Sequence, residues 1–172
     1  MKTEHTKRFI ERMQDLESKI IEAARELARE LHRGQTDKAG KDYFAEHLCR
    51  VAEMGSDWIE KTVAYLHDAA EDTPYDVEQV MQMLQERCGG QLCDANTELI
   101  SKALNLLNSK TALSREEYIN RISENKIAAR VKLNDLRHNM DLTRIENPTE
   151  KDFERVERYK KEFQQILESQ NK

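Results

Sequence analysis

The sequence has few of the residues that turn or interrupt a chain. Five Gly and two Pro make 7 of 172 residues, or about 4%, where average usage would give about 12%. β-Sandwiches, β-barrels and low-complexity disordered segments all require more turn-forming or helix-breaking residues. The composition therefore disfavours these three classes and leaves a helical domain as the main expectation.

Cysteine and long apolar runs are also scarce. Cys49, Cys88 and Cys93 are odd in number and lack the paired spacing of a zinc or redox site, so we expect reduced packing residues. No stretch approaches the roughly 18 apolar residues of a membrane span. The N-terminus lacks the apolar region of a signal peptide. We therefore expect a cytoplasmic protein without a membrane partner.

Basic residues do not outnumber acidic ones. The chain has 28 Lys and Arg against 33 Asp and Glu, which gives a formal charge of -5. Nucleic-acid-binding domains usually carry a clustered basic face, so we expect no nucleic-acid partner and consider a small charged metabolite instead. The length is close to that of one domain, and we predict a single domain over residues 1–172.

Apolar residues recur at intervals of three and four, the pattern of amphipathic helices. This spacing predicts a first helix of some thirty residues, which ends before Gly34 and is followed by a polar loop over 35–42. Another helix is expected over about 43–54. Later helices are expected to begin at Ser56 or Asp57, at Asp76, at Ser114 and at the segment Asn147-Pro148-Thr149. We predict an all-α single-domain helical bundle of about six to eight helices.

A group of ligand-type residues precedes Pro74. His67 and Asp68 are adjacent, and Glu71 and Asp72 follow within one helical turn. In a continuing helix these acids would share one face and repel one another. A divalent cation would relieve that repulsion, so the segment indicates a metal site.

Two further segments offer ligands. Asp135, His138 and Asn139 share a helix face by their spacing, and His47 lies among apolar residues that could present it to the bundle interior. Each has a simpler interpretation that the sequence leaves open. His47 could be a hydrogen-bonded core histidine, and Asp135 could form a surface ion pair with Arg137.

Four blocks in order resemble the HD-domain hydrolase of the RelA/SpoT-type alarmone enzymes, which cleave (p)ppGpp in the stringent response. They are His32-Arg33-Gly34-Gln35-Thr36-Asp37-Lys38-Ala39-Gly40, Tyr43 with His47, Leu66-His67-Asp68-Ala69-Ala70-Glu71-Asp72-Thr73, and Val131-Lys132-Leu133-Asn134-Asp135 with His138-Asn139-Met140. The resemblance covers about residues 20–168 and is strongest to the small stand-alone branch. It implies an HD-type fold and hydrolysis without synthesis.

The resemblance also implies a role for individual residues. It assigns one divalent metal ion, by family habit Mn²⁺, to His47, His67, Asp68 and Asp135; the attacking water to Glu71 and Asp72; and the nucleotide to Lys38, Tyr118 and Asn139. The implied activity is that of a guanosine 3′,5′-bis(diphosphate) 3′-pyrophosphohydrolase. Mixed nitrogen and oxygen ligands suit Mn²⁺ or a similar first-row ion, and Glu71 would orient the water and move its proton.

The sequence departs from the family pattern at two places that bear on the site. Asp37 occupies the position of an arginine that stacks on guanine, so we expect weak base selectivity and predict that Asp37→Arg improves binding of a guanosine substrate. His47 follows Tyr43 one residue later than usual. The alternatives are hydrolysis of another nucleotide or sugar phosphate, and a non-catalytic nucleotide-sensing helical module. The metal used in the cell, the regulators and the oligomeric state, a homo-oligomer included, stay open.

Overall fold

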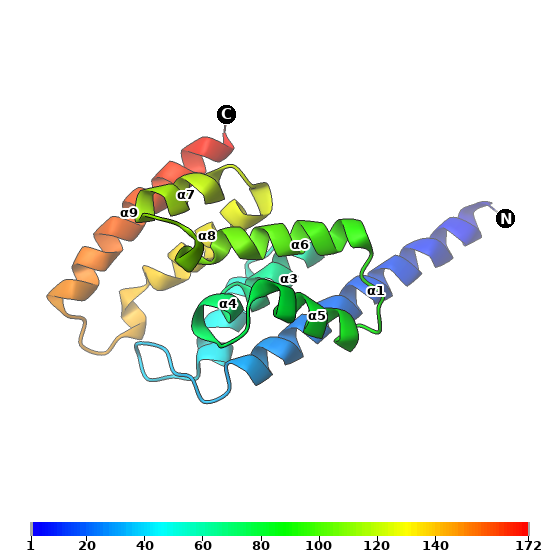
Figure 1. Cartoon of the computed structure of the whole chain (residues 1–172), viewed down its shortest axis with the longest axis horizontal. Helices are drawn as coiled ribbons and strands as arrows, with labels where there is room; N and C mark the ends of the chain where they lie inside the picture. The colour runs from blue at the N-terminus through cyan, green and yellow to red at the C-terminus, as the bar shows by residue number, and fades with distance from the viewer. Residues whose placement is uncertain (1, 172) are drawn as a thin grey trace.

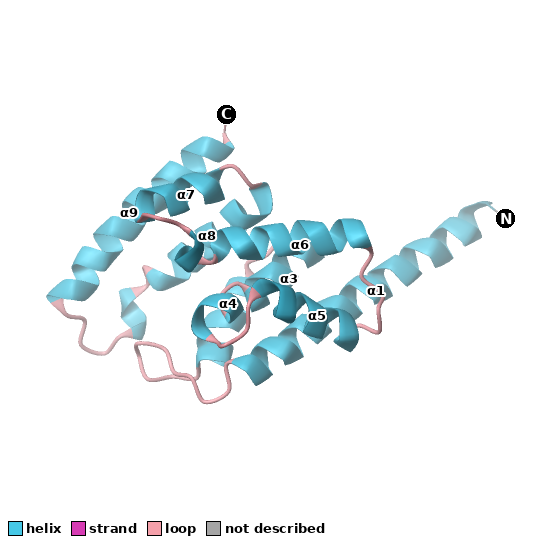
Figure 2. Cartoon of the chain, in the orientation of Figure 1, coloured by secondary structure: helices cyan, strands magenta, loops and turns pink. Residues whose placement is uncertain are grey.

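Helices make up nearly all regular structure in the computed structural model, which describes residues 2–171 (Figure 2). No β-strand forms within this range, and the loop after the first helix contains one isolated bridge. Apart from the single turn α4, the described residues form eight α-helices, which confirms the all-α class. The α-helices are α1 Lys2–Leu31, α2 Cys49–Glu53, α3 Trp58–Leu66, α4 Ala69–Asp72, α5 Val77–Arg87, α6 Asp94–Leu107, α7 Arg115–Ser123, α8 Lys126–Asn139 and α9 Glu150–Gln170.

The expected capping residues do begin their helices. Asp57, Asp76, Ser114 and Thr149 are the N-cap residues of α3, α5, α7 and α9. The first three accept a hydrogen bond from the backbone N–H three residues later, which satisfies a donor that the helix itself cannot pair. Gly34 has a φ of 79° in the turn that follows α1, a conformation that favours glycine.

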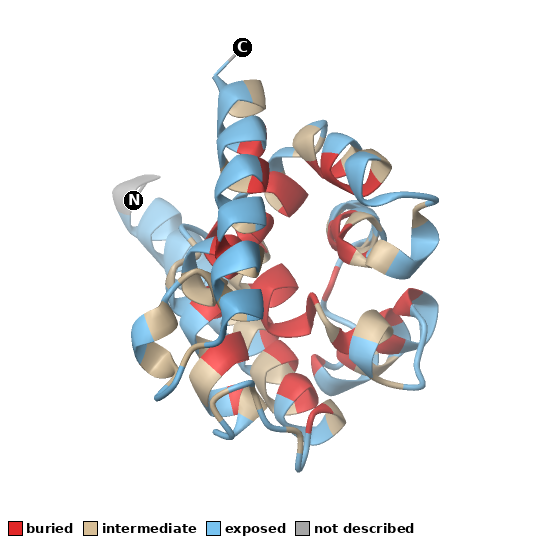
Figure 3. Ribbon diagram, turned by 90° about the vertical axis from the view of Figure 1, so that its left-hand side faces the viewer, coloured by how far each residue is buried: buried red, intermediate tan, exposed pale blue. Residues whose placement is uncertain are grey.

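The core is built around α3, which packs against α1, α2, α6 and α8. Val63, Ala64 and Leu66 of α3 are fully or almost fully buried, and Figure 3 shows buried faces of the surrounding helices turned toward one another. Burying one such aliphatic side chain stabilises the fold by about 1.5–3 kcal/mol. On the other side of α8, α7 and α9 pack together. The segments that carry the candidate ligands are therefore held between packed helices.

The expectation of buried packing is wrong for some apolar helix positions and for Cys93. Phe9 and Met13 continue the apolar pattern of α1 but are 65% and 42% exposed, because the N-terminal part of α1 projects beyond the bundle (Figure 1). Phe153 of α9 is also exposed. Cys93 is an exposed free thiol and does not pack, whereas Cys88 is buried. None of the helices in the described range combines the length and hydropathy needed to cross a bilayer.

The backbone departs from regular α-helix at two points near the candidate ligands. Residues Phe44–Leu48 form a π-helix, η1, in the segment where an α-helix was expected. Helix α3 ends at Leu66 and His67 is its C-cap residue, whereas Glu71 and Asp72 lie on the separate turn α4. The expected continuous helix through these acids is therefore wrong. π-Helical turns occur frequently at functional sites.

Candidate metal centre

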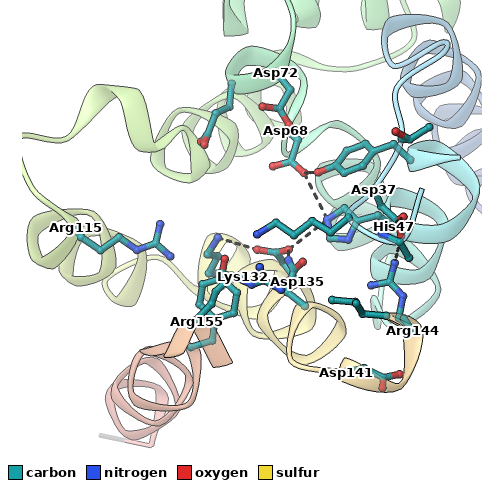
Figure 4. A pocket seen from close by; sticks show the side chains of 18 residues that line it. Asp37, His47, Asp68, Asp72, Arg115, Lys132, Asp135, Asp141, Arg144 and Arg155 are labelled. Atoms are coloured by element: carbon teal, nitrogen blue, oxygen red, sulfur yellow. Dashed lines mark hydrogen bonds and ion pairs between the residues drawn. The ribbon is translucent and has the colours of Figure 1, made fainter. Parts of the chain in front are cut away.

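Four side chains from three distant segments meet at one point. His47 belongs to η1, His67 and Asp68 lie at the junction of α3 and α4, and Asp135 lies on α8. The packing of α3 against η1 and α8 brings these segments together. Figure 4 shows His47, Asp68 and Asp135 gathered on one wall of a pocket. All four metal ligands implied by the family resemblance therefore come together.

The distances between their donor atoms suit a single cation. His47 Nε2 lies 3.5 Å from Asp68 Oδ2 and 3.3 Å from Asp135 Oδ1. His67 Nε2 lies 3.0 Å and 3.9 Å from the same two oxygens. Donors that bind a metal ion at about 2.1 Å are roughly 3.0 Å apart in octahedral and roughly 3.4 Å apart in tetrahedral coordination. The group of His47, His67 and Asp135 could hold a metal ion, whose identity the geometry does not decide.

The tautomer of His67 leaves one nitrogen free for a ligand bond. Its Nδ1 lies 2.7 Å from the carbonyl oxygen of Ala64. A carbonyl oxygen only accepts hydrogen bonds, so Nδ1 of the neutral ring carries the proton and Nε2 carries the lone pair. Within residues 2–171, this Nε2 is one of two buried side-chain N or O atoms that have no hydrogen-bond partner. An unpartnered buried nitrogen facing two carboxylates fits a metal ligand.

Neighbouring donors orient the two carboxylates. The Tyr43 hydroxyl donates to Asp68 Oδ2 at 2.5 Å. Lys132 Nζ donates to Asp135 Oδ2 at 2.7 Å, and Asn139 Nδ2 donates to Asp135 Oδ1 at 2.5 Å. Hydrogen bonds from neighbouring residues to a metal-binding carboxylate fix its orientation and tune its basicity. The expected alternative of a surface pair between Asp135 and Arg137 is wrong, because Asp135 is buried and pairs with Lys132.

The ligand group is strongly coupled electrostatically. Burial opposes the charged form of His67, but Asp68 and Asp135 raise its pKa well above the ordinary value. Burial likewise opposes ionisation of Asp68 and Asp135, yet His67 and Lys132 respectively, together with His47, hold their pKa values well below the ordinary range. Asp68 and Asp135 are therefore both ionised inside the site. When no cation is bound, protons on His47 and His67 balance their negative charge.

Glu71 and Asp72 lie beside the ligand group, on the turn α4. Glu71 Oε2 accepts a hydrogen bond of 2.9 Å from the backbone N–H of Ser109. Burial, and then repulsion from Asp68 and Glu71, raise the pKa of Asp72. A carboxyl group with a raised pKa can hold and transfer a proton nearer neutral pH. Both residues line the same pocket as the candidate metal ligands His47, Asp68 and Asp135.

The pocket in front of the ligand group has a volume of about 440 Å³, within the range of small-molecule sites. Its walls combine the acidic ligand face with basic side chains from several elements. Figure 4 shows Arg115 on the side opposite Asp37 and Arg144. The basic residues that line the pocket are Lys38, Arg115, Lys132, Arg144 and Arg155. This arrangement suits an anionic ligand that also contacts a cation.

The structure separates the three residues expected to bind the nucleotide. Lys38 and Asn139 line the pocket, although the amide of Asn139 also supports Asp135. Tyr118 does not reach the pocket, and the expectation for it is wrong. It is buried, and its hydroxyl donates to the carbonyl oxygen of Leu107 at 2.8 Å. Its ring packs under Lys132, with Nζ 5.3 Å from the ring centroid, so Tyr118 is a core residue that supports the site.

Asp37 also has a different role from the one expected. Its Oδ1 accepts hydrogen bonds from the backbone N–H groups of Ala39 and Lys41, and its Oδ2 pairs with Arg144. Only 8% of the side chain is exposed. Asp37 therefore holds the loop in shape, and a substituted arginine would lose these bonds and face Arg144. We no longer expect Asp37→Arg to improve substrate binding.

Sequence reasoning missed several residues of the site. Lys132 is buried and pairs with Asp135, and its position three residues earlier on the same helix was a usable signal. Arg115 and Arg155 have no local pattern that points to a pocket. Arg115 is held by two hydrogen bonds to Glu162 of α9, 47 residues away. Comparison with protein-family models finds no match to this chain.

Proposed function

We propose that the protein is a metal-dependent phosphohydrolase of the HD type. The observation that carries this proposal is that His47, His67, Asp68 and Asp135 meet in a pocket that also holds five basic side chains. A phosphate ester or anhydride has both features that such a pocket selects, because its oxygens can bind a cation and accept hydrogen bonds from Lys and Arg. The resemblance to HD-domain enzymes supports the same choice.

The residues divide into binding and proton-transfer roles. A bound divalent cation, which we propose to be Mn²⁺, would lower the pKa of water and neutralise charge on phosphoryl oxygens. Glu71 orients the attacking water and accepts its proton, and Asp72 supplies the proton that the leaving group takes up. Lys38, Arg115 and Arg155, which line the pocket, bind the phosphates. Asn139 keeps Asp135 in place and faces the substrate.

The proposed substrate is guanosine 3′,5′-bis(diphosphate) or its 5′-triphosphate analogue. Water attacks the phosphorus next to the 3′ oxygen, the bond between them breaks, and pyrophosphate leaves while the 3′ oxygen takes up a proton. The products are pyrophosphate and GDP or GTP. The pocket volume and the three basic residues Lys38, Arg115 and Arg155 suit a nucleotide with two phosphate groups. The proposal includes a cytoplasmic location, as expected from the sequence.

A second candidate is hydrolysis of another nucleotide or sugar phosphate. Asp37 favours it, because this carboxylate is committed to the loop and to Arg144 and cannot stack on guanine. A non-catalytic nucleotide sensor is the third candidate. The position of Glu71 and Asp72 beside the ligand group argues against it, since a sensor has no need of acid–base residues there.

Product chromatography with Mn²⁺ present separates the three candidates. We expect the wild-type protein to release pyrophosphate from the guanosine alarmone, and Glu71→Gln to be slower by roughly 10²–10⁴-fold. Glu78→Gln is the matched control, because Glu78 is exposed on α5, and it should match the wild type. Cleavage of another nucleotide with the alarmone intact would favour the second candidate. Binding of nucleotides without any cleavage would overturn the hydrolase.

A further inference from the structure

A chain of side chains connects the metal ligand His47 to the loop over residues 36–42. Its ring Nδ1 lies 2.9 Å from Nδ1 of His138. Arg144 Nη1 lies 3.1 Å from that same nitrogen of His138, and Arg144 Nη2 pairs with Asp37. The four residues come from η1, the end of α8, the short helix η3 Leu142–Arg144, and the loop. No part of the proposed reaction uses His138 or Arg144.

The proton positions along this chain follow from its donors. A guanidinium group has no acceptor, so Arg144 donates to Nδ1 of His138, which must then be unprotonated. His47 Nδ1 faces the same lone pair and must therefore carry a proton. It follows that Nε2 of a neutral His47 ring is unprotonated. This is the nitrogen that lies 3.5 Å from Asp68 and 3.3 Å from Asp135.

The surroundings protect this arrangement from water. The side chains of His47, Arg144 and Asp37 are 4%, 19% and 8% exposed. Each of the four residues contacts the next one in the series. A displacement of Asp37 or Arg144 therefore alters the position that the His47 ring can occupy.

We infer that Asp37, Arg144 and His138 are positioning residues that fix His47 with Nε2 directed at the metal site, and that they join the loop carrying Lys38 to the metal centre. The inference rests on the metal ion of the proposed function. A metal-binding histidine usually hydrogen-bonds a partner through its second ring nitrogen. Removing that partner typically weakens the metal affinity by about 10–100-fold. The loop that presents Lys38 to the substrate is thus connected by side-chain contacts to His47, which holds the metal ion.

The affinity for Mn²⁺, measured by calorimetry, tests the chain at His138. His138→Leu removes the acceptor and should weaken Mn²⁺ binding by about 10–100-fold. His138→Asn places an amide oxygen near the position of Nδ1 and should restore most of the affinity. Arg137→Met is the matched control, because Arg137 is the exposed neighbour on the same helix, and it should bind like the wild type. Urea unfolding without metal shows whether each variant is folded.

Two variants farther along the chain keep the test independent of the folding of His138→Leu. Arg144→Met should also weaken Mn²⁺ binding, by less than His138→Leu, because the acceptor remains. Asp37→Arg should weaken it too, since it sets one guanidinium against another. In Zn²⁺-loaded, ¹⁵N-labelled protein, the Nδ1 proton of His47 should give a slowly exchanging NMR signal in the wild type and in His138→Asn. This signal should be absent in His138→Leu.

The outcomes separate this inference from the proposed function. Wild-type affinity in both His138→Leu and Arg144→Met, with tight binding by the wild type, would overturn the positioning chain alone. Loss of affinity in His138→Asn as large as in His138→Leu would also overturn it, because the effect would then not depend on an acceptor. A wild-type protein that does not bind Mn²⁺ would overturn the metal centre and the chain together.

Discussion

Substituting Lys132 by Met probes the balance of charge beneath the metal site. The ammonium group donates to Asp135 Oδ2 at 2.7 Å, and the two side chains are only 11% and 7% exposed. Burial opposes the charge on Lys132, but Asp135 raises its pKa above the ordinary value. Lys132→Met keeps an unbranched apolar side chain and removes the ammonium group, together with its hydrogen bond to Asp135 and its contact with the Tyr118 ring. The carboxylate of Asp135 would then lose its strongest partner.

The expected loss of stability follows from the burial of this pair. Removing one partner of a buried ion pair costs about 3–5 kcal/mol. His47 and His67 still face Asp135 Oδ1, so we expect the lower end, about 3 kcal/mol, for the metal-free protein. For a chain of this size, 1 kcal/mol corresponds to about 2–4 °C, so the melting temperature should fall by about 6–12 °C. Saturating Mn²⁺ should recover part of this loss, because the cation replaces the missing positive charge.

Thermal and urea unfolding of the metal-free protein measure the effect. Arg137→Met is the control on the same helix, where the guanidinium is exposed and lies 5.8 Å from the centroid of the Phe163 ring. An exposed cation–π contact contributes about 0.5–1 kcal/mol, so this variant should change stability by no more than that. If Lys132→Met lowers the free energy of unfolding by no more than Arg137→Met does, Asp135 does not depend on Lys132 to compensate its charge. Our interpretation of the buried pair would then be wrong.

Three further predictions concern the site and its support. Glu71→Gln should keep the Mn²⁺ affinity within about twofold while turnover falls, since a non-ligand changes chemistry and not metal binding; calorimetry showing loss of the metal ion would make Glu71 a ligand. Tyr118→Phe should destabilise the fold by about 0.5–1.5 kcal/mol, because the bond to Leu107 is lost, and should leave the substrate KM unchanged; a raised KM would return Tyr118 to the substrate site. The Mn²⁺ affinity should rise with pH, because the raised pKa of His67 makes protons compete with the metal ion; calorimetry between about pH 6 and about pH 8 would contradict this if the affinity stayed constant.

The helices were largely predictable because their signals are local. Apolar spacing places the core face of α1 from Ile20 onward, and capping residues mark the beginnings of α3, α5, α7 and α9. The exposed start of α1 was not predictable, since periodicity shows that a face is apolar and not whether another helix covers it. Phe9 therefore continues a pattern that has no partner within the described residues.

The candidate metal ligands were found from residue type and family resemblance, whereas their supporting contacts depend on tertiary structure. Asp37 and Arg144 are 107 residues apart, and no local spacing relates them. The π-helix shows a further limit. It holds His47, which follows Tyr43 one residue later than in the family pattern, and its hydrogen-bonded turns enclose one residue more than those of an α-helix. The imidazole of His47 lies within 3.5 Å of Asp68 and Asp135 from this longer turn.

The metal content of the purified protein tests the metal centre most directly. We expect wild-type protein dialysed against Mn²⁺ to retain one ion per chain, and the double variant His67→Ala/Asp68→Ala to retain none while it stays folded by circular dichroism. The wild type should also melt at a higher temperature with Mn²⁺ than without it, and the double variant should show no such difference. A double variant that keeps one tightly bound ion per chain would contradict the assignment of the metal centre to these residues.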